Sequence, residues 1–324
     1  MGSFVHLHVH SSYSVLDGMS SISGLVDKAI GSGMNALALT DHGSMFGIKE
    51  FYNYVKKKND DKYAKIRELE SKLKSDELPE PEKTALANEL EATKLKIFKP
   101  IFGSEVYVAR RTRFDKELKE DRSGYHLVLL AKNEKGYRNL SKLVSYGWVQ
   151  GHYYRPRIDH DLLAQYSEGI IACSACLGGE IHKKVESGNM EEAEKAVLWY
   201  KKVFGDDFYL ELQRHKTDKP GADTETYVKQ EIQNTELIRL ARKTNTKLVA
   251  TNDVHFVEED HADAHEHLIC LSTGKDLDDP TRMRYTKQEW LKTPEQMKEI
   301  FADLPECIEN TLEIVDKVEY FKLE

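Results

Sequence analysis

Residues 4–10 read Phe4-Val5-His6-Leu7-His8-Val9-His10 and place three histidines at alternate positions of an otherwise apolar segment. Residues two apart on a β-strand point to the same side, so a strand over residues 4–9 would direct the three imidazoles together. Each imidazole can offer a metal ion a neutral ring nitrogen. An expression tag would run its histidines together, whereas here Leu and Val separate them. The segment therefore predicts an early strand that ends at a metal site.

The rest of the chain alternates short β-rich runs with segments of helical periodicity. Strands are predicted over residues 36–40, 100–108, 126–131, 169–174, 208–213 and 247–251. Helices are predicted between most of them, over residues 23–30, 45–56, 134–148, 190–204 and 224–244. This alternation indicates an α/β fold with a parallel sheet, and seven such units with functional residues at their C-terminal ends favour a closed barrel. An open, doubly wound sheet is the alternative.

Two stretches depart from this alternation. Residues 57–96 are dominated by Lys, Glu and Asp around Leu78-Pro79-Glu80-Pro81, and predict an inserted helical hairpin without chemistry of its own. After about Gly274 the chain becomes polar over residues 276–285, and Thr293-Pro294 opens a short predicted helix over 293–301. We therefore expect a principal domain over residues 1–275, and over 276–324 a linker and a tail that looks cut from a longer chain.

Composition narrows the class of protein. The 324 residues include 40% hydrophobic and 31% charged residues, as in ordinary soluble proteins. No apolar run is long enough to cross a bilayer, and four cysteines do not make a disulfide framework, so a cytoplasmic protein without membrane partners is expected. A net charge of −8 argues against broad coating of nucleic acid but not against local contact with DNA. Candidate phosphate contacts are Arg110, Arg111, Arg113, Arg155 and Arg157.

Residues with metal-binding side chains recur at or near the ends of the predicted strands. A barrel brings such strand ends to one mouth, where residues far apart in sequence can share a cluster. The mixture of imidazole, carboxylate and thiolate favours zinc, with manganese or iron as alternatives, over magnesium. The candidates exceed the needs of one tetrahedral ion, so two or three divalent ions are indicated. They are His8, His10, Asp17, His42, Glu105, His126, Cys176, Asp253 and His255.

The remaining histidines and cysteines have weaker contexts. Cys173 lies in an apolar strand and is expected in the core, whereas Cys176 stands beside Gly178-Gly179 and is the candidate ligand. A redox pair or half of a zinc knuckle is the alternative for these two cysteines. Surface or structural roles are expected for His152, His160, His182 and His215. An exposed helix away from the metal is expected for His261, His265 and His267.

Together the motifs His8-x-His10, Thr40-Asp41-His42-Gly43 and Asp253-x-His255 resemble the polymerase and histidinol phosphatase (PHP) superfamily. Residues 4–18, 39–52, 125–143, 155–159, 173–181 and 250–255 look like the N-terminal PHP domains of bacterial DNA polymerase III alpha subunits. This resemblance covers nearly the whole chain apart from residues 57–96. It implies a distorted seven-stranded (β/α) barrel, followed after Gly274 by the start of the polymerase palm. Asp is frequent in the superfamily where this chain has His6, so His6 is expected to support the ligands rather than bind metal.

The resemblance also implies how three metal ions would divide the ligands. The first ion takes His8, His10, Glu105 and Asp253. The second shares Glu105 with His126 and Cys176, and the third takes Asp17, His42 and His255. Of these, the expected catalytic residues are His8, His10, Asp253 and His255. Phosphates of the substrate would be steadied by Arg110, Arg155 or Arg157.

Clustered divalent ions suit phosphoester hydrolysis, because they bind the phosphate and lower the pKa of a bridging water towards ~7. The implied function is a multinuclear-metal phosphoesterase in DNA replication, with 3′→5′ exonuclease proofreading on a single-stranded or frayed DNA 3′ end. The implied partner is the remainder of a polymerase chain, whose nucleotidyltransferase active site lies outside these residues. One alternative is a catalytically silent module that stabilises the polymerase and docks a proofreading exonuclease or other replisome components. Another, against which the polymerase-like motifs argue, is a free-standing histidinol-phosphate phosphatase.

Overall fold

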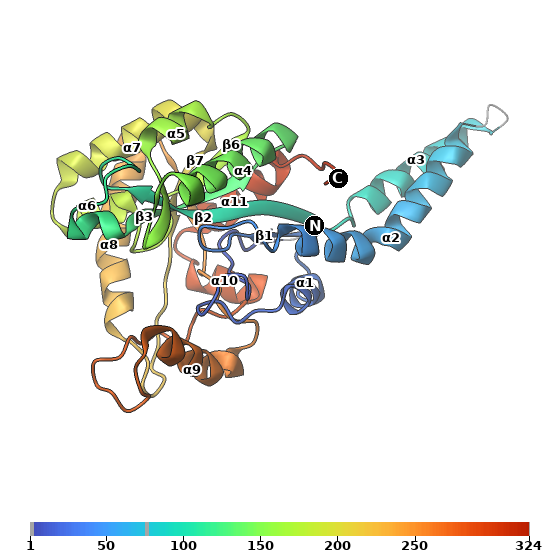
Figure 1. Cartoon of the computed structure of the whole chain (residues 1–324). Helices are drawn as coiled ribbons and strands as arrows, with labels where there is room; N and C mark the ends of the chain where they lie inside the picture. Colours follow the sequence, from blue (N-terminus) through green and yellow to red (C-terminus); the bar gives the residue numbers. More distant parts are fainter. Residues whose placement is uncertain (1–2, 75–77, 324) are drawn as a thin grey trace.

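The computed structural model describes residues 3–74 and 78–323, which form one eight-stranded sheet with helices packed around it (Figure 1). The strands are β1 (Ala36–Leu39), β2 (Lys99–Ala109), β3 (Gly124–Ala131), β4 (His152–Tyr153), β5 (Arg155–Ile158), β6 (Ile170–Cys173), β7 (Phe208–Leu212) and β8 (Lys247–Ala250). The helices are α1 (Ile22–Gly31), α2 (Ile48–Leu73), α3 (Glu80–Lys94), α4 (Glu134–Val149), α5 (His160–Gln165), α6 (Glu180–Glu186), α7 (Met190–Phe204), α8 (Glu225–Thr244), α9 (Ala262–Thr273), α10 (Pro294–Ile300) and α11 (Pro305–Lys317). The predicted α/β class is confirmed, and β4 and β5 are strands that the sequence pattern did not reveal.

The sheet curls, and the N-terminal segment over residues 4–10 lies between β1 and the chain that follows β8. Its order is β4-β5-β2-β3-β6-β7-β8, and β1 pairs with β2 outside that path. The segment over residues 4–10 lies against β1, where Ala38 N donates to His6 O at 3.0 Å. The same segment lies against the chain that follows β8, where His10 N donates to Val254 O at 2.7 Å. The segment and six of the strands therefore complete a distorted barrel, while β4 and β5 extend the sheet beside it.

The prediction that residues 4–9 form a regular strand is wrong. Only Val9 makes a ladder-type bridge there, with Val254. Two backbone donors of the segment are satisfied by threonine hydroxyls instead of by a neighbouring strand: Val5 N donates to Thr311 Oγ1 at 3.2 Å and Val9 N donates to Thr40 Oγ1 at 2.8 Å. Because side-chain acceptors replace ladder partners, the segment stays extended but bends at His8.

This bend decides where the three early histidines point. Val5 and Leu7 pack in an inner cluster that holds side chains from every strand of the barrel, whereas Val9 packs in a different cluster outside it. The inward register therefore shifts between Leu7 and Val9. His6 points outward and its Nε2 lies 2.8 Å from Lys292 O, apart from the other two histidines. The inner cluster comprises Val5, Leu7, Ala36, Ala38, Ile101, Val128, Leu130, Ile171, Cys173, Ala175, Tyr209, Val249, Ile314, Val315 and Val318.

The sheet is mixed rather than parallel, which corrects the expectation from strand–helix alternation. β3 runs antiparallel to both β2 and β6, whereas β1–β2, β6–β7 and β7–β8 are parallel. A parallel neighbour needs a long crossover, usually a helix. Between β2 and β3 the chain forms only the 3₁₀ turn Lys119–Arg122, so it returns directly beside the strand it left. The first residues of β3 consequently lie at the edge where β1, β6, β7 and β8 end.

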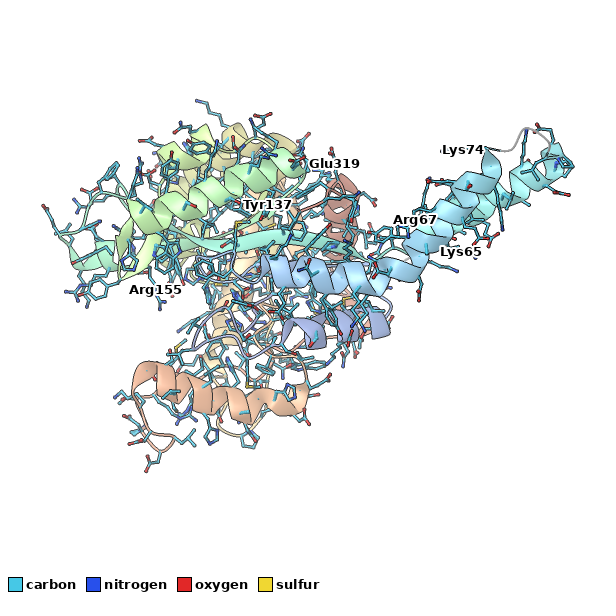
Figure 2. The ribbon with its side chains drawn as sticks, turned by 45° about the vertical axis from the view of Figure 1, so that its right-hand side comes forward. Lys65, Arg67, Lys74, Tyr137, Arg155 and Glu319 are labelled. Carbon is cyan, nitrogen blue, oxygen red and sulfur yellow. The ribbon has the colours of Figure 1, made fainter. Side chains whose placement is uncertain are left out.

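The predicted hairpin extends away from the barrel (Figures 1 and 2). α2 is continuous from Ile48 to Leu73, so the helix expected over residues 45–56 and the first arm of the hairpin are one element. α3 packs back along α2, and residues 75–77 of the turn lie outside the described residues. Asn59 fastens the base of the hairpin: its Nδ2 donates to Phe98 O at 2.8 Å and its Oδ1 accepts from Phe98 N at 3.0 Å.

The C-terminal part packs on the barrel. The helix expected over residues 293–301 forms as α10, with Thr293 accepting from Gln296 N as its N-cap. α11 was not anticipated; it packs against β8, and its Ile314 and Val315 close one end of the inner cluster. Among residues 3–74 and 78–323, no helix is both long and apolar enough to cross a membrane.

Replacing Asn59 by Ala should destabilise the fold, because it leaves the buried N–H and C=O of Phe98 without partners. We expect a loss of about 1–3 kcal/mol and a melting temperature roughly 2–10 °C lower in thermal denaturation. Asn53→Ala, at an exposed position of the same helix, is the matched control and should leave the melting temperature nearly unchanged. Equal melting temperatures for the two variants would contradict the role given to Asn59.

Candidate metal centre

The candidate ligands continue the inward-facing register of their strands at one end of the barrel. On β2, Glu105 lies on the same side of the strand as Ile101, and on β3, His126 lies on the same side as Val128. Ile101 and Val128 both belong to the inner cluster. The antiparallel direction of β3 places its early residue His126 at the same edge as the loops that follow the parallel strands. His42 comes after β1, and it forms a bridge with Glu105. The inner cluster therefore forms the floor of the polar site.

The first predicted ligand group surrounds His8. Its Nε2 lies 3.3 Å from Glu105 Oε1 and 3.1 Å from Asp253 Oδ1. His10 Nε2 is 3.3 Å from Glu105 Oε2 and 3.3 Å from Asp253 Oδ1. Two imidazole nitrogens thus face two carboxylates, and His8, His10 and Glu105 offer ligand atoms within 4.8 Å of one another.

The second group shares Glu105. His126 Nδ1 lies 2.9 Å from Glu105 Oε1, and Cys176 Sγ lies 3.5 Å from His126 Nδ1. Gly178 packs directly against the imidazole, where an added Cβ would lie 3.0 Å from the ring. A larger residue there would displace the ring of His126, so the glycine after Cys176 helps to bring this group together.

The third group lies on the other side of Glu105. His42 Nδ1 is 2.7 Å from Glu105 Oε2, and His42 Nε2 is 2.7 Å from Asp17 Oδ2. His255 Nε2 lies 3.6 Å from the same Asp17 oxygen. His10 also belongs here geometrically, because the ligand atoms of His10, His42 and His255 lie within 4.8 Å of one another.

The donor set fits divalent cations. His8 Nδ1 lies 2.7 Å from Glu211 and His255 Nδ1 lies 2.8 Å from the carbonyl of Asp253, and both of these oxygens can only accept. Ser14 donates its hydroxyl proton to Asp41, so it accepts from His10 Nδ1. In its neutral form each ring therefore carries its proton on Nδ1 and leaves the lone pair of Nε2 for a metal ion. Several atoms of the site are buried and have no hydrogen-bond partner in the described chain. They are Nε2 of His8, His10 and His255, Nδ1 of His42, Oε2 of Glu105 and Oδ1 of Asp253.

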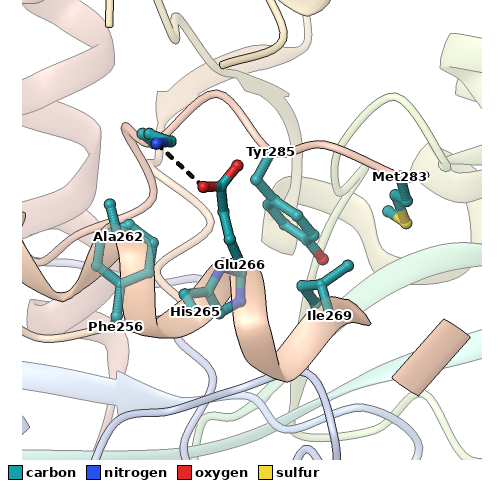
Figure 3. Close-up of a pocket in the computed structure, with 8 residues that line it drawn as sticks. Phe256, Ala262, His265, Glu266, Ile269, Met283 and Tyr285 are labelled. Atoms are coloured by element: carbon teal, nitrogen blue, oxygen red, sulfur yellow. Dashed lines mark ion pairs between the residues drawn. The ribbon is translucent and has the colours of Figure 1, made fainter. Parts of the chain in front are cut away.

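Four supporting residues escaped prediction from the sequence. Glu211 and Ser14 hold the Nδ1 atoms of His8 and His10. The Tyr285 hydroxyl donates to Asp17 Oδ1 at 2.7 Å, and His265 Nε2 lies 2.8 Å from the Asp17 carbonyl oxygen. Figure 3 shows Tyr285 and His265 lining one small pocket, with α9 contributing the histidine. A charged residue in the apolar strand over residues 208–213 was the available signal for Glu211.

The expectation for the helix over residues 261–267 is therefore partly wrong. His267 is exposed, but His265 is buried and packs 5.8 Å from His255 between ring centroids. As expected, the remaining histidines lie outside the ligand groups: His152 is exposed at the rim, His160 and His182 pack around α6, and His215 is buried against Gln230. Cys173 is buried in the inner cluster, as predicted.

The backbone around the ligands is held in an unfavourable conformation. Asp253 has φ 46°, and the residues that precede two other ligands, Leu16 and Ala175, have φ 61° each. Such left-handed conformations cost of order 1–3 kcal/mol for residues other than glycine and persist only when the surroundings enforce them. The loops that aim Asp17, Cys176 and Asp253 into the site are therefore maintained by tertiary packing.

The carboxylates raise the pKa values of several imidazoles. Burial disfavours the charged form of His8, but Asp253, Glu211 and Glu105 outweigh it and hold the pKa of His8 well above its usual value. Burial is likewise outweighed by Asp17 and Asp253 at His255, whose pKa is raised to about 9. Burial raises the pKa of the Cys176 thiol, and Asp253 and Glu105 add to that shift. Protons therefore compete with metal for these atoms.

A cleft of about 730 Å³ opens over the ligand groups, and Arg155 lines it. Arg155 is exposed and is labelled in Figure 2. The expectation that Arg157 contacts phosphate does not fit its burial: its guanidinium donates to Gly151 O at 3.0 Å and Arg113 O at 3.1 Å. Arg110 is exposed but lies over the Tyr125 ring outside the cleft lining. The other two arginines form ion pairs, Arg111 with Asp121 and Arg113 with Asp159.

The chain is similar to known proteins over nearly its whole length. The family model described as PHP domain matches residues 6–215. The DNA polymerase III subunit alpha of Borreliella burgdorferi is 40% identical over 324 residues, covering 99% of this chain and 24% of that protein. The subunit of Campylobacter jejuni is 39% identical over 328 residues, covering 98% of this chain and 23% of that protein. The chain thus spans about a quarter of the length of these relatives. Among solved structures, an amidohydrolase from Chromobacterium violaceum is 14% identical with a TM-score of 0.42, covering 79% of this chain and 89% of that one.

Replacing Glu211 by Gln should weaken metal binding without unfolding the chain. The substitution preserves the shape of the side chain but removes the negative charge that holds His8 Nδ1–H, so we expect about a 10- to 100-fold loss of affinity. A competition titration with a chromophoric chelator measures it. Glu191→Gln, at an exposed position of α7, is the matched control. Equal affinities for the two variants would contradict the positioning role of Glu211.

Metal binding should release protons and should strengthen as the pH rises. The pKa of His255 is raised to about 9 and that of His8 lies well above its usual value, so both imidazoles hold protons at neutral pH that a metal ion must displace. Calorimetry in buffers of different protonation enthalpy, between about pH 6 and 9, should show net proton release that diminishes at the upper end. Binding without proton release at neutral pH would contradict this electrostatic description.

Proposed function

The chain belongs to the PHP domain family, as its motifs predicted, and from that premise we propose that it is a multinuclear-metal phosphoesterase. The observation that carries the proposal is the position of Glu105. Its two carboxylate oxygens lie within 3.3 Å of nitrogens from His8, His10, His42 and His126, at the junction of all three ligand groups. One bridging carboxylate between imidazole-rich groups is an arrangement suited to neighbouring divalent ions.

The proposed ligands are those expected from the sequence. His8, His10, Glu105 and Asp253 would hold one ion; Glu105, His126 and Cys176 a second; and Asp17, His42 and His255 a third, with zinc favoured by the nitrogen and sulfur donors. Bound divalent ions would supply Lewis-acid stabilisation of a phosphate and an acidified water. His8, His10, Asp253 and His255 would then be catalytic through the ions they hold.

The chain's own residues perform the remaining work in this proposal. Glu211 and Ser14 hold the Nδ1 atoms of His8 and His10, so that a metal ion which displaces the Nε2 proton would find both Nε2 lone pairs directed into the site. Arg155 would bind a substrate phosphate, and its position in the lining of the cleft supports this role.

We further propose that the substrate is the 3′ end of DNA and that the reaction is 3′→5′ exonucleolytic trimming in replication. This part is supported by similarity to DNA polymerase III alpha subunits over nearly the whole chain. The remainder of such a polymerase would be its partner, with residues 276–324 leading from the PHP domain over 1–275 towards the palm. A separate proofreading exonuclease and other replisome components are further proposed partners, and the cytoplasm is the proposed compartment.

Elemental analysis of chelator-free protein, together with hydrolysis of 3′-labelled single-stranded DNA, tests this function. We expect about two to three zinc, manganese or iron ions per chain and metal-dependent trimming. The double variant His8→Ala/Asp253→Ala should lower trimming by at least about 100-fold, because two ligands of one ion are lost. His267→Ala, at an exposed histidine of α9, is the control and should retain activity.

The outcomes separate the alternatives. Bound metal without trimming would favour a catalytically silent module that stabilises the polymerase and docks an exonuclease. Metal-dependent release of phosphate from histidinol phosphate, without action on DNA, would favour a free-standing phosphatase. Absence of bound metal from the purified chain, with no binding on titration, would overturn the ligand assignment.

A further inference from the structure

Four aromatic side chains stand on one wall of the metal cleft. This aromatic rim consists of Phe46, Trp148, His152 and Tyr154, all of which line the same cleft as the ligands. Phe46 is 67% exposed, Tyr154 63% and Trp148 43%. Large apolar rings left open together beside a polar site mark a place where a ligand is bound rather than a packing defect.

The rim is rigidly connected to the ligand groups. Trp148 Nε1 donates to Gly43 O at 2.8 Å, and Gly43 directly follows the candidate ligand His42. The Trp148 and His152 rings stack with centroids 5.3 Å apart and an interplanar angle of 15°. The Phe46 ring also lies near the indole, at 6.5 Å between centroids. The indole is therefore held by a hydrogen bond and two neighbouring rings while part of its surface stays open.

Tyr154 occupies a position that favours glycine. It is the single residue between β4 and β5, where Tyr153 pairs with Arg155, and its φ is 63°. Glycine or asparagine adopts this left-handed conformation more readily, so backbone stability does not explain an aromatic residue at the tip. The exposed phenol ring itself is what this turn presents to the cleft.

Arginines without carboxylate partners in the described chain lie at the same cleft. Arg155 and Arg284 line the cleft, and the guanidinium of Arg122 lies 5.1 Å from the centroid of the Tyr154 ring. Within residues 3–74 and 78–323, none of these three arginines forms an ion pair with a carboxylate. The cleft is thus lined by open aromatic rings and by Arg155 and Arg284, next to groups that fit divalent metals. Single-stranded nucleic acids offer the complement: stackable bases joined by regularly spaced phosphates.

We propose that the aromatic rim stacks on the terminal bases of a single-stranded DNA end and so delivers its last phosphodiesters to the ligand groups. The inference rests on the proposed function and adds to it a binding surface and a preference for unpaired bases. Phe46 and Tyr154 supply open ring faces, Trp148 and His152 form the supporting stack, and Arg155 neutralises a phosphate between them. Paired bases are already stacked in a duplex and cannot use the rim, so a frayed or mismatched end binds preferentially.

The test compares two oligonucleotides of equal length and charge by fluorescence anisotropy. One carries normal bases, and the other carries abasic residues at its last three 3′ positions; both end in phosphorothioate linkages so that trimming does not interfere. The chain should bind the normal oligonucleotide about 5- to 150-fold more tightly for each stacked base. The double variant Phe46→Ala/Tyr154→Ala should bind both alike, and Phe46→Tyr/Tyr154→Phe should retain the preference.

Tyr320→Ala is the matched control, because Tyr320 is also an exposed aromatic residue, at 44%, but packs on Tyr63 of α2 away from the cleft. It should keep the full preference for bases. Equal affinity of the unaltered chain for both oligonucleotides, or a preference that persists in Phe46→Ala/Tyr154→Ala, would overturn the proposal. Binding of neither oligonucleotide would also overturn it. Trimming is measured separately, so a base preference without trimming would refute the phosphoesterase function while leaving the stacking surface established.

Discussion

The burial of one carboxylate, that of Glu105, is the constraint on which the rest of the site depends. Its side chain is 1% exposed, and an isolated charge in such a position costs several kcal/mol. Burial alone would raise the pKa of Glu105, but His126, His8 and His42 outweigh it and hold that pKa well below its usual value. The barrel must therefore bring imidazoles from separate segments to one strand position. Protons on those imidazoles or divalent ions between them can provide the positive charge, and the open Nε2 lone pairs favour the ions.

An irregular N-terminal segment meets this requirement better than a regular strand would. In a strand with strict alternation, His8 and His10 would share a side with His6, which points outward to Lys292 O. The bend at His8 lets Val5 and Leu7 fill the inner cluster while His8 and His10, further along, reach Glu105 and Asp253. The segment makes fewer ladder hydrogen bonds than a regular strand would. The hydroxyls of Thr40 and Thr311 accept instead from the backbone N–H groups of Val9 and Val5. Barrel closure and ligand geometry thus arise from the same departure from regular structure.

Sequence pattern was sufficient for whatever depends on local periodicity or on ligand chemistry. Strands β1, β2, β3, β6, β7 and β8 and helices such as α7 follow from burial period, and the nine candidate ligands gather at one mouth because strand ends meet there. The pattern could not reveal that β3 runs antiparallel to β2. The connection between these strands contains no α-helix, and a missing helix leaves no periodicity in the sequence that would predict the direction. The pattern marked Glu211 only as a charged residue in an apolar strand, because its role appears only once its partner His8, far away in sequence, is placed beside it. The expectation that Arg157 contacts phosphate does not fit the structure, because its guanidinium donates to backbone carbonyls. In the sequence, such a buried arginine cannot be told from an exposed one.

Asp17 shows how far the site depends on residues that no motif contains. The residue before it, Leu16, adopts a left-handed conformation with φ 61°, which the surrounding structure must enforce. Its carboxylate accepts from the hydroxyl of Tyr285, and its carbonyl oxygen lies 2.8 Å from His265 Nε2. Both supports come from the chain after β8, and Tyr285 comes from the polar stretch that composition alone marked as a linker. That stretch reaches back to a ligand near the N-terminus, so the geometry of the third group is determined only when residues beyond 275 are packed. The third group of candidate ligands and the chain after residue 275 are therefore mechanically joined through Asp17.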